Sequence, residues 1–593
     1  MSTAILTGQP VPGSPIEGDL RSLGFDVRTA ADAAEAETLL AQVPSRERVA
    51  VVDARFVGHV HALRLGLTDP RFPLAAIPGA LTAQPAARQA LTRALARENS
   101  AAGTTLVDSL ADRLVEALDT DVHRPELGSL VAEVPADPQV RNEARQAVAA
   151  VDDEAVRLKS AVKARDGFFT TFCISPYSRY LARWCARRGL TPNQVTTASL
   201  LTALIAAGCA ATGTRGGFVA AGVLLLFSFV LDCTDGQLAR YSLQYSTLGA
   251  WLDATFDRAK EYAYYAGLAL GAARGGGSDD VWALALGAMV LQTCRHVVDF
   301  SFNEANHDAT ANTSPTAALS DKLDSVGWTV WVRRMIVLPI GERWAMIAVL
   351  TALTTPRITF YALLVGCAFA AAYTTAGRVL RSLTRKAVRT DRAARALADL
   401  ADSGPLTELL PAKILTRSPN ALVAALIGAV LVTGSAAVWG AGWQTVLGAV
   451  GYVVCSAAAV GRPLKGALDW LVPPVFRAAE YGTVLILAAR SEVNGALPAA
   501  FGLVAAVAYH HYDTVYRIRG NAGAPPAWLV RAVGGHDGRT LVVTVLAAVL
   551  TASQFPVALT ALAVAVALVV LVESIRFWVS AGAPAVHDEG EPA

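Results

Sequence analysis

The sequence predicts a mainly α-helical polytopic membrane protein with a small cytoplasmic α/β domain at its N-terminus. Apolar residues make up 53% of the 593 residues, which is high for a soluble protein. Long apolar segments recur after residue 190, while short apolar runs alternate with helical stretches before residue 100. A chain of this length exceeds what one hydrophobic core usually supports, so we expect several domains.

Charge and cysteine content argue against several classes of protein. The formal net charge of +2 gives no reason to expect nucleic acid as a partner. The seven cysteines are scattered without CxxC spacing, which argues against both a disulfide framework and a zinc site. The start of the chain lacks the basic and apolar regions of a secretory signal, so we expect it to remain in the cytoplasm.

The N-terminal domain is expected over residues 1–100. Three apolar runs read as buried strands of a parallel α/β domain, at 4–8, 49–54 and 72–78. Helices are expected between and after them, near 31–43 and 83–97. A helical connector at 101–165 then leads to the membrane.

Two membrane blocks follow, at 166–385 and 419–593, separated by a polar cytoplasmic linker at 386–418. The first block has six expected spans, at 193–212, 216–239, 246–271, 280–301, 343–355 and 358–378. Basic clusters before the first of these spans and after the sixth place both ends in the cytoplasm. The second block has six more, at 420–439, 443–461, 474–490, 496–513, 540–554 and 557–575.

Four aspartates lie at facing ends of the second and third expected spans. Asp232 and Asp235 are three residues apart, and Asp253 and Asp257 are four apart, so each pair lies on one face of a helix. The short connection makes the two helices antiparallel neighbours, so the carboxylates can converge. Carboxylates are costly in a bilayer and repel one another unless neutralised, and oxygen ligands favour hard divalent cations. A pair of Mg²⁺ ions, with Mn²⁺ as the alternative, would clamp phosphates during a displacement.

A simpler interpretation treats the four aspartates as interfacial charges paired with Arg240, Arg258 and Lys260. Four acidic residues at these spacings, accompanied by Gly236 and Gly249, favour the metal site, because glycine permits close approach of backbone to ligand.

The stretch "DCTDGQLARYSLQYSTLGAWLDATFD" resembles the motif of the CDP-alcohol phosphotransferase family. That motif is D-x-x-D-G-x-x-A-R, eight residues, then G-x-x-x-D-x-x-x-D. All its fixed positions are filled, by Asp232, Asp235, Gly236, Ala239, Arg240, Gly249, Asp253 and Asp257. The resemblance covers about 158–385: "GLTPNQVT" (189–196) is similar to the family's entry into its first span, and "SPYSRYLARWCARRG" (175–189) to its amphipathic surface helix.

The resemblance implies transfer of a substituted phosphate from a CDP-linked donor to an acceptor hydroxyl, with release of CMP. It implies that Asp232, Asp235 and Asp253 hold two Mg²⁺ ions and that Asp257 helps hold the second ion and is the general base. It also implies that the CDP group is bound by Gly236, Ala239, Arg240 and Gly249. Family members are commonly dimers, which implies a homodimer.

An anionic acceptor, such as inositol phosphate or glycerol phosphate, would need cations near the metals. Five basic residues are candidates by depth: Arg258, Lys260, Arg295, Arg334 and Arg378. For Arg295 a salt bridge to Asp299, one turn on, is slightly favoured over acceptor binding.

The N-terminal domain resembles the cytidylyltransferase domain that some family members carry. Lys163, Asp166 and Gly167 match the K-x-x-DG-F junction, but the first expected strand lacks a G-x-G-x-R loop, so we expect a degenerate domain. Two donors therefore stay open: membrane-held CDP-diacylglycerol, which is favoured, or soluble CDP-inositol.

The second membrane block resembles an accessory domain found beside this transferase in some actinobacterial proteins. Its polar residues include His510, His511, Asp513, Arg517, Arg519, His536, Asp537 and Arg539. We expect them at one membrane interface, where they anchor the domain and bind lipid head groups, with a second active site as the alternative.

Taken together, these features predict an integral protein of the cell membrane that makes phospholipids, with its active site on the cytoplasmic side. Its partners would be the CDP-linked donor, a polyol or polyol-phosphate acceptor and membrane lipid. The alternative is a non-catalytic scaffold or transporter that retains an ancestral metal site. Intact acidic positions argue against it.

Overall fold

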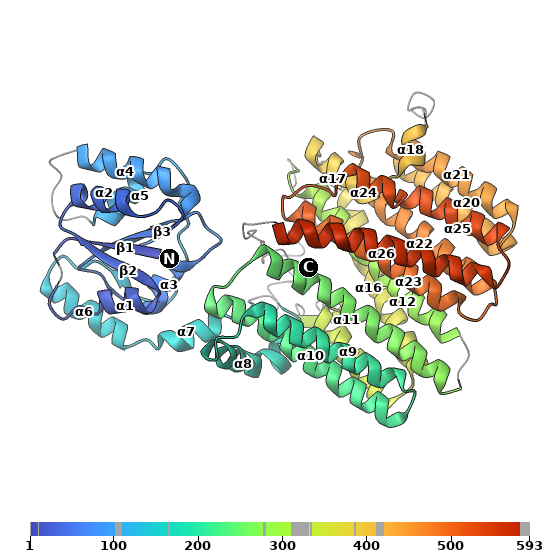
Figure 1. Ribbon diagram of the computed structural model, residues 1–593, viewed down its shortest axis with the longest axis horizontal. Helices are drawn as coiled ribbons and strands as arrows, with labels where there is room; N and C mark the ends of the chain where they lie inside the picture. The colour runs from blue at the N-terminus through green and yellow to red at the C-terminus, as the bar shows by residue number, and fades with distance from the viewer. Residues whose placement is uncertain are drawn as a thin grey trace.

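The computed structural model places a small α/β domain beside a large helical body (Figure 1). It describes residues 2–9, 11–100, 109–163, 166–276, 280–309, 331–332, 335–384, 387–410 and 420–580. The predicted fold class, a mainly α-helical polytopic membrane protein with an N-terminal α/β domain, is confirmed.

The N-terminal domain is built on a five-stranded sheet in the order β2-β1-β3-β6-β5. Its strands are β1 (Ser2–Thr7), β2 (Phe25–Ala30), β3 (Arg48–Asp53), β5 (Leu74–Ile77) and β6 (Ala80–Ala83). β1 pairs in parallel with β2 and β3, but β6 is antiparallel to β3 and β5. The predicted parallel sheet is therefore wrong at this edge. The antiparallel pairing arises from a tight hairpin between β5 and β6 at Gly79, whose φ of 76° favours glycine.

Helices cover both faces of this sheet and enclose two apolar cores (Figure 1). One face packs against α2 (Ala33–Gln42), α4 (Arg88–Ser100) and α5 (Leu110–Ala117). The other packs against α1 (Ile16–Ser22) and α3 (Val60–Thr68). A short strand pair, β4 (Val57–Gly58) with β7 (Ala132–Glu133), lies outside this sheet. That the domain is a degenerate cytidylyltransferase stays a prediction.

Three helices connect the α/β domain to the helical body: α6 (Pro138–Ala149), α7 (Asp153–Ser160) and α8 (Ser175–Arg187). From α7, Arg157 donates to the carbonyl of Tyr241 at 2.7 Å, and Glu154 accepts from the hydroxyl of Tyr241 at 2.8 Å. The connector is thus tied directly to the end of the helix that carries the first aspartate pair.

A helix occupies each of the twelve segments expected to span. In the first block they are α9 (Pro192–Ala211), α10 (Arg215–Ser242), α11 (Thr247–Arg274), α12 (Asp280–Asn306), α15 (Ile340–Leu353) and α16 (Pro356–Thr384). In the second they are α20 (Ala421–Trp439), α21 (Trp443–Val460), α22 (Val472–Arg490), α23 (Ala496–Arg519), α25 (Gly535–Val549) and α26 (Gln554–Ser580). Between the blocks lie α17 (Asp391–Ala401) and α18 (Pro405–Leu409), and α24 (Ala527–Ala532) precedes α25.

Within the described residues, eight of these helices are long and apolar enough to cross a membrane. The other four are α11, α15, α23 and α25. α15 and α25 have 14 and 15 residues, which reach only about 21–23 Å at 1.5 Å per residue, against a hydrocarbon core of about 30 Å. α11 and α23 are long enough but carry several charged side chains. For these four helices, spanning stays a prediction.

The two helical blocks share one hydrophobic core. α12, in the first block, packs against α22 and α23 of the second. Met289 of α12 and Val507 of α23 belong to the same buried cluster. Polar contacts cross this boundary as well: His296 Nδ1 lies 2.6 Å from the hydroxyl of Tyr512. The second block is therefore packed as part of the helical body around the aspartates.

Candidate active site

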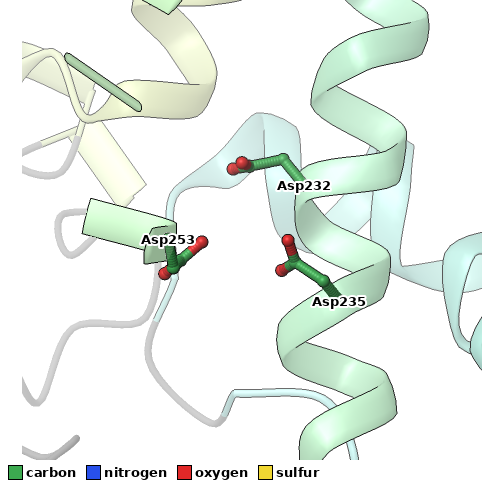
Figure 2. Close-up of side chains that lie close together, drawn as sticks. All are labelled: Asp232, Asp235 and Asp253. Atoms are coloured by element: carbon green, nitrogen blue, oxygen red, sulfur yellow. The ribbon is translucent and has the colours of Figure 1, made fainter. Parts of the chain in front are cut away.

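Three of the four predicted aspartates converge (Figure 2). Asp232 and Asp235 project from α10, and Asp253 faces them from α11. One carboxylate oxygen from each lies within 4.8 Å of the other two. Two helices that meet near their connection thus bring together carboxylates 18 residues or more apart in the chain.

The donor set fits a hard divalent cation. Three carboxylates offer only oxygen ligands, which suit Mg²⁺, Ca²⁺ or Mn²⁺. Asp235 is 4% exposed, and among the described residues its Oδ2 has no hydrogen-bond partner, an arrangement that a cation would relieve. The acidic cluster predicted from sequence is therefore present, and its chemistry is that of a metal site.

Asp257 is held by a buried lysine. Lys260, one turn on, is inaccessible to solvent, and its Nζ contacts Asp232 Oδ1 and lies 3.1 Å from Asp257 Oδ1. Ser199 Oγ of α9 lies 3.1 Å from the same Nζ. Lys260 thus neutralises part of the acidic cluster from inside the protein, as the simpler interpretation of the sequence proposed for this residue.

Local capping fixes where the two aspartate-bearing helices begin and end. α10 ends at Leu243, which adopts a left-handed conformation with φ of 51°. α11 begins at Ser246, whose Oγ accepts from the backbone N–H of Gly249 at 2.9 Å. A Cβ on Gly249 would lie 2.7 Å from Asn193 Oδ1 and 2.8 Å from Ser246 Oγ, so an alanine there must displace the Asn193 amide or the hydroxyl that caps α11.

The other motif residues line a cavity of about 520 Å³ that reaches from the carboxylates. Gly236, Ala239, Arg240 and Gly249 all border it. Arg240 also donates from Nε to the carbonyl of Ala161 at 2.6 Å, which braces the connector. A Cβ on Gly236 would meet Arg240 only at 3.5 Å, so packing alone does not demand glycine there.

Residues from all parts of the chain border this cavity. Arg71 comes from the α/β domain, where its guanidinium pairs with Asp69 at 2.8 Å and stacks 3.9 Å from the ring of Tyr245. Lys163 comes from the connector. The linker and second helical block contribute Arg392, Tyr516, Arg519 and Asn521.

The basic residues predicted to bind the acceptor do not border this cavity where the structure describes them. Arg258 pairs with Glu261 at 2.8 Å, and Lys260 is enclosed as described above. Arg295 is buried and donates to the carbonyl of Val337. Asp299, its expected salt-bridge partner, pairs with Arg378. Arg334 lies outside the described residues. Acceptor binding by these residues stays a prediction.

The cations that do border the cavity are Arg71, Lys163, Arg240, Arg392 and Arg519. Only Arg240 was assigned to the site from sequence. Lys163 belongs to a junction motif and Arg519 to a basic loop. Neither sequence feature indicated that the side chain would border this cavity. Arg71 and Arg392 stand in segments without a recognisable motif, so only the tertiary structure brings them here.

The polar residues of the second block form a buried network instead of an exposed interface. Asp402 accepts from Arg539 Nη2 at 2.7 Å, and its two oxygens lie 3.1 and 3.2 Å from Nε2 of His510 and His511. Asp537 accepts from the backbone N–H of Gly404 at 2.7 Å. The cavity beside Arg539 measures only about 10 Å³. The predicted exposed interface is therefore wrong for these residues, except that Arg519 remains exposed. Binding of lipid head groups stays a prediction.

The two halves of the helical body match two different known families. Residues 189–372 match the model for CDP-alcohol phosphatidyltransferase, and residues 391–593 match a family of unknown function (DUF5941). All four aspartates lie in the first segment, whereas Arg392, Tyr516 and Arg519 lie in the second.

Several curated relatives match part of the chain. The phosphatidylinositol phosphate synthase of Streptomyces avermitilis is 33% identical over 130 residues, 21% of this chain and 51% of the relative. The bifunctional IPC transferase and DIPP synthase of Aquifex aeolicus is 31% identical over 114 residues, 19% of this chain and 26% of the relative. The archaetidylinositol phosphate synthase of Pyrococcus horikoshii is 34% identical over 91 residues, 15% of this chain and 47% of the relative.

The chain thus spans about half the length, or less, of these relatives. The family match and the converging aspartates concern the same segment of α10 and α11. Residues 189–372 are therefore similar to the CDP-alcohol phosphatidyltransferase family, and the converging aspartates lie within this segment.

Proposed function

We propose that the protein transfers a substituted phosphate from a CDP-linked donor to the hydroxyl of a polyol or polyol phosphate in phospholipid synthesis. The observation that carries this proposal is the convergence of Asp232, Asp235 and Asp253 beside a 520 Å³ cavity bordered by the remaining motif residues. The volume lies within the range of about 300–1,000 Å³ typical of small-molecule sites.

In the proposed reaction, the acceptor oxygen forms a bond to the phosphorus that bears the donor's alcohol, and the diphosphate P–O bond breaks to release CMP. Asp257 borders the cavity and takes the proton of the attacking hydroxyl. Lys260 Nζ lies 3.1 Å from this carboxylate and holds it in place before the transfer.

Asp232, Asp235 and Asp253 would hold two Mg²⁺ ions, with Asp257 completing the second site. Bound divalent ions supply charge that stabilises the diphosphate as negative charge develops on the leaving CMP. Arg240 borders the same cavity and binds phosphate from the side of the connector, while Gly236, Ala239 and Gly249 leave room for the cytidine diphosphate.

The relatives' names favour an inositol-containing product. Two of them are named for synthesis of inositol phosphate lipids, which supports a membrane-held CDP-diacylglycerol donor and a polyol-phosphate acceptor. The third is named for both IPC transfer and DIPP synthesis, which keeps soluble CDP-inositol as the alternative donor.

We place the site at the cytoplasmic face of the cell membrane. α8 supports this orientation: Tyr177, Tyr180 and Trp184 are 50, 45 and 49% exposed on a helix that also carries arginines. Aromatic rings beside basic residues are typical of a helix that lies at the lipid interface. The homodimer stays a prediction.

The test is CMP release by the purified full-length protein in mixed micelles with Mg²⁺. CDP-diacylglycerol and CDP-inositol are each offered with inositol, glycerol and their phosphates. We expect turnover with at least one pair and its loss on removal of divalent ions with EDTA. Absence of CMP release with every pair would contradict the proposed function.

Two substitutions test the assigned roles. Asp257→Asn removes the base and is expected to lower the rate by about 10²–10⁴-fold. Asp235→Asn weakens the metal sites, so its loss of activity should be partly restored by higher Mg²⁺. Asp257→Asn also loses the base, so higher Mg²⁺ should restore much less of its activity. Identical Mg²⁺ responses for the two variants would argue against separate roles. Both proteins should keep the elution volume of the wild type in size-exclusion chromatography.

A further inference from the structure

The α/β domain reaches the cavity of the acidic cluster through one arginine. Arg71 lies in the loop between α3 and β5, and its guanidinium stands 3.9 Å from the centroid of the Tyr245 ring. Tyr245 belongs to the short connection between α10 and α11, the two helices that carry the aspartates. Both side chains border the cavity. A contact between two domains therefore lies at the connection that sets how the two aspartate pairs face each other.

The loop that carries Arg71 is held within its own domain. The Gln84 side chain donates to the carbonyls of Pro70 and Phe72, at 2.8 Å each. The guanidinium of Arg71 donates to both carboxylate oxygens of buried Asp69, at 3.1 and 2.8 Å. Such a two-pronged pair fixes the plane of a guanidinium as well as its position. The α/β domain thus presents a planar cation whose orientation is set by its own side chains.

The connection that receives this cation is fixed at both ends by hydrogen bonds. At its start, the backbone N–H of Gln244 donates to the carbonyl of Ala239 at 3.0 Å. At its end, Ser246 Oγ accepts from the N–H of Gly249 at 2.9 Å and so caps α11. Tyr245 lies between these two points and is half-buried. The guanidinium stacked on its ring adds a contact in the middle of the connection.

We propose that Arg71 is a positioning residue of the transferase, which acts through Tyr245 to hold the two aspartate-bearing helices in fixed positions. The part of this inference that concerns turnover rests on the proposed function. A guanidinium over an aromatic face is attracted by the charge distribution of the ring, and its flat shape suits stacking better than an ammonium does. The α/β domain thereby becomes part of the working transferase.

Hydrogen exchange of the full-length protein in detergent tests the contact without any substrate. Arg71→Gln removes the stacked cation, and Arg55→Gln is the matched control. Arg55 pairs with Asp53 at 2.9 Å with the same two-residue spacing as Arg71 with Asp69, but in the described part of the chain it does not border the cavity.

We expect Arg71→Gln to speed exchange in the peptide that covers residues 240–249 by about two- to thirtyfold, the range that loss of a cation–π pair supplies. Arg55→Gln should leave exchange in this peptide as in wild type. Equal exchange in wild type and both variants would overturn the proposal, and so would equal acceleration by both variants.

Steady-state CMP release then tests whether the contact positions the acidic cluster. We expect Arg71→Gln to lower kcat by about tenfold, because a shift of about 1 Å at reacting groups can cost about 10²-fold. Tyr245→Leu should lower kcat at least as much. The double variant should be no slower than Tyr245→Leu alone, since Arg71 acts through that ring. Additive losses in the double variant, or a wild-type kcat in Arg71→Gln, would overturn the positioning role.

The two measurements separate this inference from the proposed function. If the wild type releases no CMP but Arg71→Gln alone speeds exchange, the contact stands and the transferase assignment falls. If the wild type turns over and Arg71→Gln matches Arg55→Gln in both measurements, the transferase assignment stands and this inference falls. Should Arg71→Gln unfold, Arg71→Lys keeps the charge without the planar fork and is expected to give intermediate exchange and kcat. Wild-type values for Arg71→Lys would then refute the role of the stacked guanidinium.

Discussion

At the scale of the residue, Lys260 shows how the helical body accommodates its acidic cluster. Its side chain is fully enclosed and contacts Asp232 and Asp257. A buried ammonium shared by two carboxylates offsets charge that would otherwise repel. The remaining negative charge, on Asp235 and Asp253, borders the cavity where the proposed ions and diphosphate would lie.

Replacing Lys260 with Gln should therefore destabilise the protein strongly. Removing one partner of a buried ion pair leaves charge uncompensated and costs about 3–5 kcal/mol. Thermal unfolding in detergent is the measurement, with Lys465→Gln as control because its pair with Asp391 is solvent-exposed. A melting temperature equal to that of wild type would show that the ammonium is not needed to balance the carboxylates.

At the scale of the element, the start of α11 depends on a close approach to α9. Thr191 caps α9 in a reciprocal pair with Gln194, which fixes where Asn193 lies. Gly249 then packs against the Asn193 side chain, whose amide a methyl group at this position would displace. This contact fixes the first turn of α11 against α9, next to Asp253, which borders the cavity.

Gly249→Ala should lower turnover by about tenfold or more, because an ångström-scale shift of a reacting group can cost about 10²-fold. The added methyl group would sit 2.7 Å from Asn193 Oδ1 and 2.8 Å from Ser246 Oγ, so it must displace that amide or break the hydrogen bond that caps α11 before Asp253. Gly208→Ala in α9 is the control, since nothing described lies within 4 Å of its added methyl group. CMP release measures the effect, and equal rates for both variants would refute the steric role of Gly249.

At the scale of the whole molecule, Asp402 joins segments more than 100 residues apart in sequence. Burial alone would raise the pKa of Asp402, but Arg539 and the imidazoles of His510 and His511 outweigh it and hold the pKa well below its usual range. A depressed pKa in the folded state stabilises the protein above the unfolded value of about 4, and this stabilisation is lost as the pH falls below that value.

Asp402→Asn should lower the melting temperature near neutral pH and reduce the loss of stability between about pH 5 and pH 3. Asparagine tolerates the left-handed conformation at this position, where φ is 54°, so the backbone is not the cause. Glu408→Gln, which removes an exposed carboxylate of α18, is the control. Melting curves across this pH range are the measurement, and equal pH profiles for Asp402→Asn and wild type would contradict the assignment.

The sequence by itself determined the fold class, the positions of the long helices and the acidic motif. These features depend on local pattern: hydropathy sets helices, and three- and four-residue spacing sets which side chains share a face. The antiparallel edge of the N-terminal sheet was missed because β6 is a short strand next to a tight turn.

Only the tertiary structure decided which cations from distant segments border the cavity. Lys260 lies inside the protein in contact with Asp232. Arg71, Arg392 and Arg519 border the cavity although they are far away in the chain. The strength of an electrostatic interaction depends on distance in space. Residue spacing along one helix does not indicate which side chains of another domain lie close to it. For that reason the acidic cluster was predictable from the motif, whereas the cations that border the cavity from other segments were not.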